Sequence, residues 1–150
     1  MKILACTDGS EYSKKALQQA MEIADGCKVN EVVILHVYDS KITNILSYSS
    51  EVITPDLITQ YQQMLEEDKK KKEKMLLEAK KIFQQRNIKT RTIFKEGIPS
   101  ETIIQIAKEE EIDVIVISSR GLGGLKKVLL GSVSNSVIQE AENCSVLIVK

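Results

Sequence analysis

Residues 113–138 read DVIVISSRGLGGLKKVLLGSVSNSVI and contain, in order, a strand-like run, a glycine-rich loop and a helix-like repeat. The run DVIVIS (Asp113–Ser118) is rich in β-branched residues, as buried strands are. Beyond the loop, from Ser132 to about Ala141, Val133, Val137 and Ile138 recur at helical spacing. A strand that leads through a loop into a helix is the repeating unit of an α/β protein.

The same alternation extends through the rest of the chain. Apolar or β-branched runs predict four more strands, at Lys2–Asp8, Glu31–Tyr38, Lys89–Glu96 and Ser145–Val149. Helical periodicity predicts three more helices. The first begins at Glu11, with Ser10 as its N-cap, and ends at Gly26. The second runs from Pro55 to about Gln85, and the third covers Glu101–Glu110. The order βαβαβαβαβ predicts an α/β fold with a parallel sheet covered by helices on both faces.

Size and composition predict one small domain, residues 1–150, in the cytoplasm. The 21 basic and 21 acidic residues cancel, which argues against nucleic acid as a partner. No apolar run approaches the roughly 20 residues that span a bilayer, and the N-terminus has no signal-peptide pattern.

The three cysteines lie far apart without a CxxC motif, as expected for free thiols in a reducing compartment. The charged run at 66–74 (EEDKKKKEK) indicates a solvated helix face, with a membrane or partner patch as the alternative.

Open parallel sheets bind ligands beyond the carboxyl ends of their strands, so three places stand out: Asp8, residues 37–39, and Ser118 onward. The loop after Ser118 has the components of a phosphate site. Glycine allows the backbone close to an anion, and exposed amides at a helix N-terminus, near Gly131–Val133, attract negative charge. Polar and charged side chains lie nearby, from Arg120, Lys126, Lys127, Ser132 and Ser134. The alternative is that Gly121, Gly123 and Gly124 serve only a tight turn.

Two common phosphate motifs do not fit this loop. GxxxxGK[ST] requires a lysine between the glycine and the hydroxyl residue, but Gly131 is followed directly by Ser132. GxGxxG requires a third glycine where Lys126 stands, and it belongs after the first strand rather than the fourth. Neither P-loop hydrolysis nor dinucleotide binding is indicated.

Asp8 ends the first strand, where a carboxylate could bind ribose hydroxyls. The alternative is a turn or helix-capping aspartate before Gly9 and Ser10. His36, the single histidine, lies within an apolar run and is interpreted as a packing residue. No Ser–His–Asp or Cys–His arrangement and no metal-ligand motif is present, so no catalytic residue is assigned.

Four stretches resemble the universal stress protein family along nearly the whole chain: residues 3–17 (ILACTDGSEYSKKAL), His36-Val37, residues 96–121 (EGIPSETIIQIAKEEEIDVIVISSRG) and residues 146–150 (VLIVK). The most specific likeness is to the family's ATP signature, Gly-x2-Gly-x9-Gly-Ser/Thr. Gly121, Gly131 and Ser132 match it, whereas Ser118 replaces its first glycine, where a side chain could narrow the space near the ribose or triphosphate.

The resemblance implies a five-stranded Rossmann-like sheet in the order 3-2-1-4-5 and a homodimer formed through the last strand (Val146, Leu147, Ile148, Val149). It implies that Asp8 binds ribose, that the backbone of Val37 reads adenine, and that Cys6, Thr7 and Ile117 line the base and sugar pocket. It also implies a phosphate site at Ser118, Gly121, Gly131, Ser132 and Val133, with Mg²⁺ as an optional companion of the phosphates. Two further departures are Cys6, where some ATP-binding members have proline, and Ser145, where the family usually has proline before the last strand.

The leading hypothesis is an ATP-binding regulator or sensor of the stress response, in which nucleotide changes conformation or assembly. The alternatives are a weak ATPase or phosphotransferase, and a family member that binds no nucleotide. A phosphorylation-controlled receiver is disfavoured, because receivers cluster acids after the first strand and only Asp8 is present there.

Overall fold

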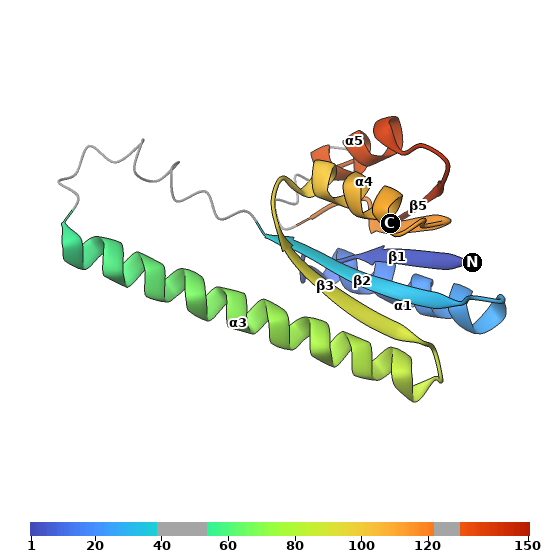
Figure 1. Ribbon diagram of the computed structural model, residues 1–150, viewed down its shortest axis with the longest axis horizontal. Coiled ribbons are helices and arrows are strands. Elements are labelled where there is room, and N and C mark those ends of the chain that lie inside the picture. The colour runs from blue at the N-terminus through green and yellow to red at the C-terminus, as the bar shows by residue number, and fades with distance from the viewer. Residues whose placement is uncertain (39–53, 122–129) are drawn as a thin grey trace.

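The computed structural model describes residues 1–38, 54–121 and 130–150. Its five strands are β1 (Lys2–Cys6), β2 (Glu31–Tyr38), β3 (Thr90–Glu96), β4 (Val114–Ser118) and β5 (Ser145–Val149). All four strand pairings are parallel, and the order across the sheet is β3-β2-β1-β4-β5 (Figure 1). Both the parallel sheet and its order are confirmed. β1 ends at Cys6, two residues before the predicted end.

The helices cover both faces of the sheet, as predicted (Figure 1). One face is packed by α1 (Glu11–Gly26) and α3 (Pro55–Gln85), whose buried residues share a core with alternate residues of β1 and β2. The other face is packed by α4 (Pro99–Glu109) and α5 (Ser132–Glu140). Strand residues alternate between the two cores because successive side chains of a strand point to opposite faces.

Local sequence explains where the helices begin. Ser10 caps α1, its hydroxyl accepting a hydrogen bond from the amide of Ser13 at 3.1 Å. Thr54 caps α3 in the same way and is followed by Pro55, which suits the first helical turn. α4 begins at Pro99 rather than at the predicted Glu101, because a proline at the first helical position has its dihedral angle already set.

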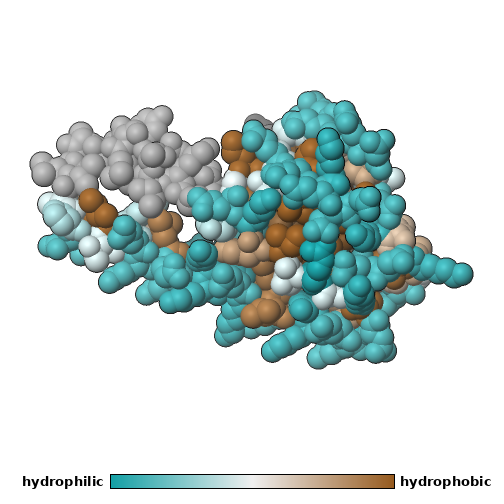
Figure 2. All heavy atoms as spheres, in the orientation of Figure 1, coloured by the Kyte–Doolittle hydropathy of each residue, from teal (hydrophilic) through white to brown (hydrophobic). Residues whose placement is uncertain are grey.

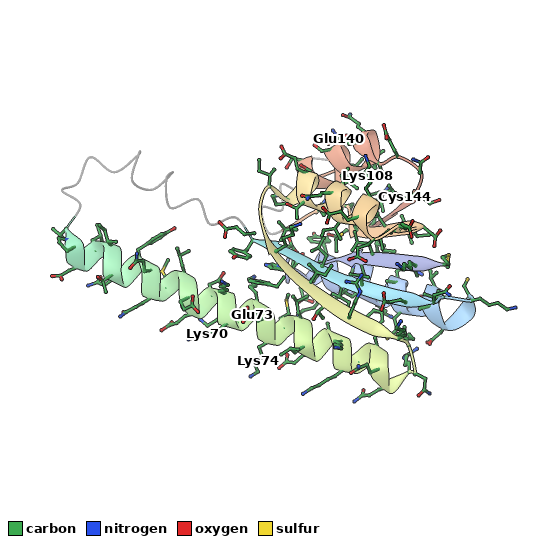
Figure 3. The ribbon with its side chains drawn as sticks, viewed as in Figure 1. Lys70, Glu73, Lys74, Lys108, Glu140 and Cys144 are labelled. Atoms are coloured by element: carbon green, nitrogen blue, oxygen red, sulfur yellow. The ribbon has the colours of Figure 1, made fainter. Side chains whose placement is uncertain are left out.

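The helix α3 is longer than the sheet, and its N-terminal half projects beyond it (Figure 1). Its buried residues, Leu76, Ala79 and Phe83, all lie in its C-terminal half. Figure 3 labels Lys70, Glu73 and Lys74 in the middle of α3, and all three are exposed, which supports the prediction of a solvated charged face. On the projecting end, hydrophobic atoms lie among hydrophilic ones (Figure 2); the exposed apolar residues there include Leu57, Ile58 and Met64.

Within residues 1–38, 54–121 and 130–150, none of the helices combines the length and the apolar character needed to cross a bilayer.

Candidate functional site

A cavity of about 700 Å³ opens at the carboxyl ends of β1, β2 and β4, on the face covered by α4 and α5. All ten residues that the sequence predicted for a nucleotide site line this cavity: Cys6, Thr7, Asp8, Val37, Ile117, Ser118, Gly121, Gly131, Ser132 and Val133. They come from four separate parts of the chain. Their roles toward a ligand remain predictions, but the structure brings them together at one place.

One end of the cavity is apolar. Cys6, Leu35 and Ile117 are nearly fully buried and belong to the core beneath α4 and α5, against which Val37 also packs. Burial raises the pKa of the Cys6 thiol to about 12, so this group is a neutral thiol at physiological pH. An apolar wall of this kind suits the flat face of an aromatic base.

The other end of the cavity is formed by the N-terminus of α5. Gly131 is the N-cap residue and has no side chain to satisfy the first amides of the helix. Its own amide donates a hydrogen bond of 2.7 Å to the carbonyl of Ser119, and the Ser134 hydroxyl donates one of 3.0 Å to the carbonyl of Gly131. Ser119 in turn donates to the carbonyl of Val149 in β5. The end of β4 thus holds the start of α5 beside it, and the helix dipole favours an anion there.

The two glycines of the matched signature differ in their surroundings. A Cβ on Gly131 would meet its nearest neighbour, the Ser119 carbonyl, at 3.5 Å, which is ordinary contact. A Cβ on Gly121 would lie only 2.7 Å from Oδ2 of Asp8. Within residues 1–38, 54–121 and 130–150, packing therefore opposes a side chain at position 121 but not at position 131.

Asp8 lies between the cavity and the turn that leads into α1. Its Oδ1 accepts a hydrogen bond of 2.9 Å from the amide of Ser10, which is the turn role considered as an alternative from the sequence. Gly9 has a φ of +84°, as this tight turn requires. Asp8 nonetheless lines the cavity. The turn contact therefore also fixes the direction of the carboxylate.

Ser118, at the position of the missing glycine, makes a specific contact of its own. Its hydroxyl donates a hydrogen bond of 2.6 Å to the carbonyl of Arg120. The side chain is buried at the end of β4 and lines the cavity. The replacement thus supplies a hydrogen bond that stabilises the first turn of the loop.

His36 is a packing residue, as expected. It is 5% exposed, its ring stacks on Phe94, and its Nδ1 lies 2.7 Å from the carbonyl of Thr7, to which the ring N–H donates. Burial lowers the pKa of His36, although the hydrogen bond to Thr7 acts in the opposite direction. The ring points toward α3 rather than toward the cavity, since neighbouring residues of a strand face opposite ways.

Sequence reasoning missed several residues around the site. Pro99 and Ile103 of α4, Leu35 of β2, Leu130 and Asn135 also line the cavity. Pro99 follows β3, so the rule about carboxyl ends of strands, applied to every strand, would have found it. Lys72, assigned to the solvated face, instead donates a hydrogen bond of 3.3 Å to the carbonyl of Asp8. Asp39, Gly123, Gly124, Lys126 and Lys127, also named from the sequence, lie outside the described residues.

No group of three or more His, Cys, Asp or Glu side chains that could hold a metal ion occurs in the described ranges, 1–38, 54–121 and 130–150. A divalent cation at this cavity would take oxygen ligands, which Asp8 and Ser132 could supply together with the phosphates of a nucleotide.

Comparison with known proteins gives matches along the whole chain. The family model described as the universal stress protein family matches residues 1–150. The universal stress protein YxiE of Bacillus subtilis is 36% identical over 149 residues, which cover 99% of this chain and 98% of that protein. The universal stress protein MJ0577 of Methanocaldococcus jannaschii is 34% identical over 157 residues, covering 99% and 94%.

Solved structures agree with this result. The structure of MJ0577 superposes with a TM-score of 0.77 over 99% of this chain and 94% of that one, at 34% identity. A universal stress protein in complex with cAMP has a TM-score of 0.65 at 22% identity, covering 99% and 95%. One from Archaeoglobus fulgidus in complex with dAMP has a TM-score of 0.62 at 20% identity, covering 100% and 98%. At 22% and 20% identity, the cAMP and dAMP complexes show similarity of fold alone.

Proposed function

Because this chain belongs to the universal stress protein family, we propose that it binds ATP in the cavity at the carboxyl end of its sheet and acts as a nucleotide-dependent regulator in the cytoplasm. The observation that carries the proposal is the glycine at 131. Among the described residues the atom nearest to a Cβ there is the Ser119 carbonyl oxygen at 3.5 Å, an ordinary contact, and the residue caps a helix whose N-terminus borders the cavity. A phosphate that approaches this backbone closely accounts for the glycine.

The proposed roles of the lining residues follow the polarity of the cavity. Adenine lies against the apolar end, with Cys6, Thr7 and Ile117 around base and sugar and the backbone of Val37 beside its edge. Asp8 accepts hydrogen bonds from the ribose hydroxyls. The phosphates lie at the α5 end, held by Ser118, Gly121, Gly131, Ser132 and Val133, with Mg²⁺ as their companion. Two proteins that share this fold were solved in complex with cAMP and with dAMP, so an adenine nucleotide is the ligand class that we propose and test.

The proposed activity is binding rather than rapid turnover. The single histidine of the sequence, His36, points to the face of the sheet opposite the cavity and is hydrogen-bonded to the Thr7 carbonyl. The proposed role of Asp8, whose carboxylate accepts a hydrogen bond from the turn amide of Ser10, is to orient a ribose rather than to activate water. A weak ATPase or phosphotransferase would require turnover that disappears in Asp8→Ala or Ser132→Ala.

We propose that nucleotide binding acts on the assembly of the chain into a homodimer through its last strand. β5 is an edge strand, and Val146, Leu147, Ile148 and Val149 are only half-buried. The amide of Ser145 and the carbonyl of Val149 are bonded toward β4, so the backbone groups of Val146 and Ile148 point to the open edge. We expect a solution mass twice the 16.8 kDa of one chain, and a monomer for Val146→Lys, because edge lysines block strand pairing. The three free cysteines support a reducing compartment.

Mass spectrometry of ligand released from freshly purified protein tests the binding directly, followed by calorimetry with Mg-ATP. We expect adenine nucleotide in the preparation and a fall in ATP affinity of at least about tenfold in Gly131→Val, whose side chain crowds the phosphates. Gly26→Val is the matched control, since nothing lies within 4 Å of a Cβ at Gly26 at the far end of α1. Absence of both retained nucleotide and heat at millimolar Mg-ATP would refute the proposal.

A further inference from the structure

Arg120 is the single cation, and Asp8 the single acid, among the described residues that line the cavity. Arg120 lies two residues beyond the end of β4 and next to the N-terminus of α5: its Cα would be 3.7 Å from a Cβ on Gly131. The following residue, Gly121, lies against Asp8. Arg120 is therefore located between the phosphate end of the cavity and the turn that begins α1.

Two contacts hold Arg120 in this position. The Ser118 hydroxyl binds its carbonyl at 2.6 Å, which fixes the backbone. The guanidinium carbon lies 5.8 Å from the centroid of the Tyr12 ring, in the first turn of α1, which is within the range of a cation–π interaction. An aromatic ring attracts the cation without neutralising it or taking up its N–H donors, as a carboxylate partner would.

We propose that Arg120, oriented by Tyr12 and Ser118, is the residue that reads the length of the phosphate chain, so that the cavity prefers ATP to AMP and adenosine. This inference rests on the proposed nucleotide binding and adds its specificity. The amides at the start of α5 can bind a phosphate group, and a charged donor beside them strengthens the binding of further phosphates. A guanidinium supplies paired N–H donors that match phosphate oxygens, and its charge makes these bonds stronger than neutral ones.

The glycine signature provides backbone amides and the hydroxyl of Ser132 but no positive charge, which Arg120 adds. Ser118, which replaces the first glycine of that signature, then has a defined role: its hydroxyl holds the carbonyl of Arg120, the residue that carries the charge. Tyr12, outside the cavity, becomes a positioning residue, and its contact joins α1 to the ligand site.

Calorimetric titration of the full-length protein with adenosine, AMP, ADP and ATP, each with Mg²⁺, tests the inference. In the wild type we expect affinity to rise with each added phosphate. In Arg120→Gln the ATP affinity should fall about tenfold while adenosine affinity changes less than about twofold, because one charge-assisted interaction is lost. Tyr12→Leu should lower the preference for ATP over adenosine in the same direction, and Tyr12→Phe should preserve it, because the ring is what orients the guanidinium.

Lys108→Gln is the matched control for the lost charge, since Lys108 lies in the last turn of α4, away from the cavity (Figure 3). Its ratio of ATP to adenosine affinity should equal that of the wild type. Circular dichroism checks that each variant is folded. Suppose that the wild type binds ATP, but that Arg120→Gln lowers the affinities for adenosine and ATP by the same factor or changes neither. The inference is then overturned, while the proposed function stands. If the wild type binds no nucleotide, both are overturned.

Discussion

Gly121 lies against Asp8 so closely that a Cβ at position 121 would be 2.7 Å from Oδ2 of the aspartate and 3.8 Å from its Cγ. These residues are more than a hundred positions apart in the chain and meet because β1 and β4 are neighbours in the sheet. The glycine at 121 therefore sets where the carboxylate of Asp8 can lie.

Gly121→Ala should displace the Asp8 carboxylate and lower ATP affinity by about tenfold, the worth of one misplaced charge-assisted hydrogen bond. The measurement is calorimetry on Gly121→Ala, Asp8→Ala and the double variant. Because both changes act on the same carboxylate, Gly121→Ala should have little further effect once Asp8 is removed. Additive losses would show that position 121 acts on the ligand by another route.

Gly131→Ser should separate folding from ligand binding. A serine at an N-cap accepts a hydrogen bond from the first amides of the helix, so α5 should be stabilised by roughly a few tenths of a kcal/mol. The same hydroxyl occupies amides that a phosphate would use, and ATP affinity should fall by at least about tenfold. Urea unfolding and calorimetry measure the two effects. A variant of unchanged ATP affinity would contradict a phosphate site at this helix end.

Gly9→Ala should destabilise the fold by about 1–2 kcal/mol, because a residue with a Cβ is strained at a φ of +84°. Its Cβ would also meet Sδ of Met75 at 3.0 Å and Nζ of Lys72 at 3.3 Å, both on α3. Gly26→Ala is the control: nothing lies within 4 Å of its Cβ, and alanine favours a helix by about 0.5–1 kcal/mol. Urea unfolding should move the two midpoints in opposite directions.

Ser118→Gly restores the family signature yet should lower stability by about 1–2 kcal/mol, from the lost hydrogen bond to Arg120 and the greater freedom of glycine at a strand end. Ser118→Ala removes the same hydrogen bond but not the Cβ, and should cost about 1 kcal/mol. Thermal unfolding measures both changes. Equal stability of all three proteins would show that the hydroxyl contributes nothing to the turn.

His36 should make the protein less stable in mild acid. Burial lowers its pKa in the fold, so between that value and about 6.5, its ordinary value, the unfolded chain binds the proton more readily. The stabilisation is present above pH 6.5 and is lost as the pH falls toward the folded pKa. Urea unfolding at pH 5.5, 6.5 and 7.5 should give a slope in the wild type that is reduced in His36→Gln. A slope of the same size in the variant would assign the effect to other groups.

The bounds of the helices and strands were predictable because each element carries its own signal. The period of the apolar residues changes from strand to helix, and Ser10, Thr54 and Pro55 are residues that begin helices. The deviations are small and local: β1 ends two residues early, and α4 starts at Pro99. The strand order did not follow from periodicity, which cannot say which strands are neighbours, and came instead from the family resemblance.

The glycine loop and Asp8 could be identified from the sequence because they follow strands, and parallel strands place their carboxyl ends at one edge. The partners of these residues could not be identified in that way. The sequence places Lys72 in an exposed charged run, but α3 crosses the sheet so that this lysine reaches the Asp8 carbonyl. Ile103 lines the cavity because α4 packs beside α5, which is a matter of helix packing.

Sequence alone therefore determined the elements, their order along the chain and the chemical types present at the ends of the strands. Tertiary structure decided the distances: the Asp8 carboxylate against Gly121, the Arg120 guanidinium over the Tyr12 ring, and the ordinary space around Gly131. The reason is physical. Propensity and capping act between residues a few positions apart, whereas the contacts of Asp8 with Gly121 and of Tyr12 with Arg120 join segments more than 100 residues apart. These contacts exist only once the sheet order and register bring the segments together.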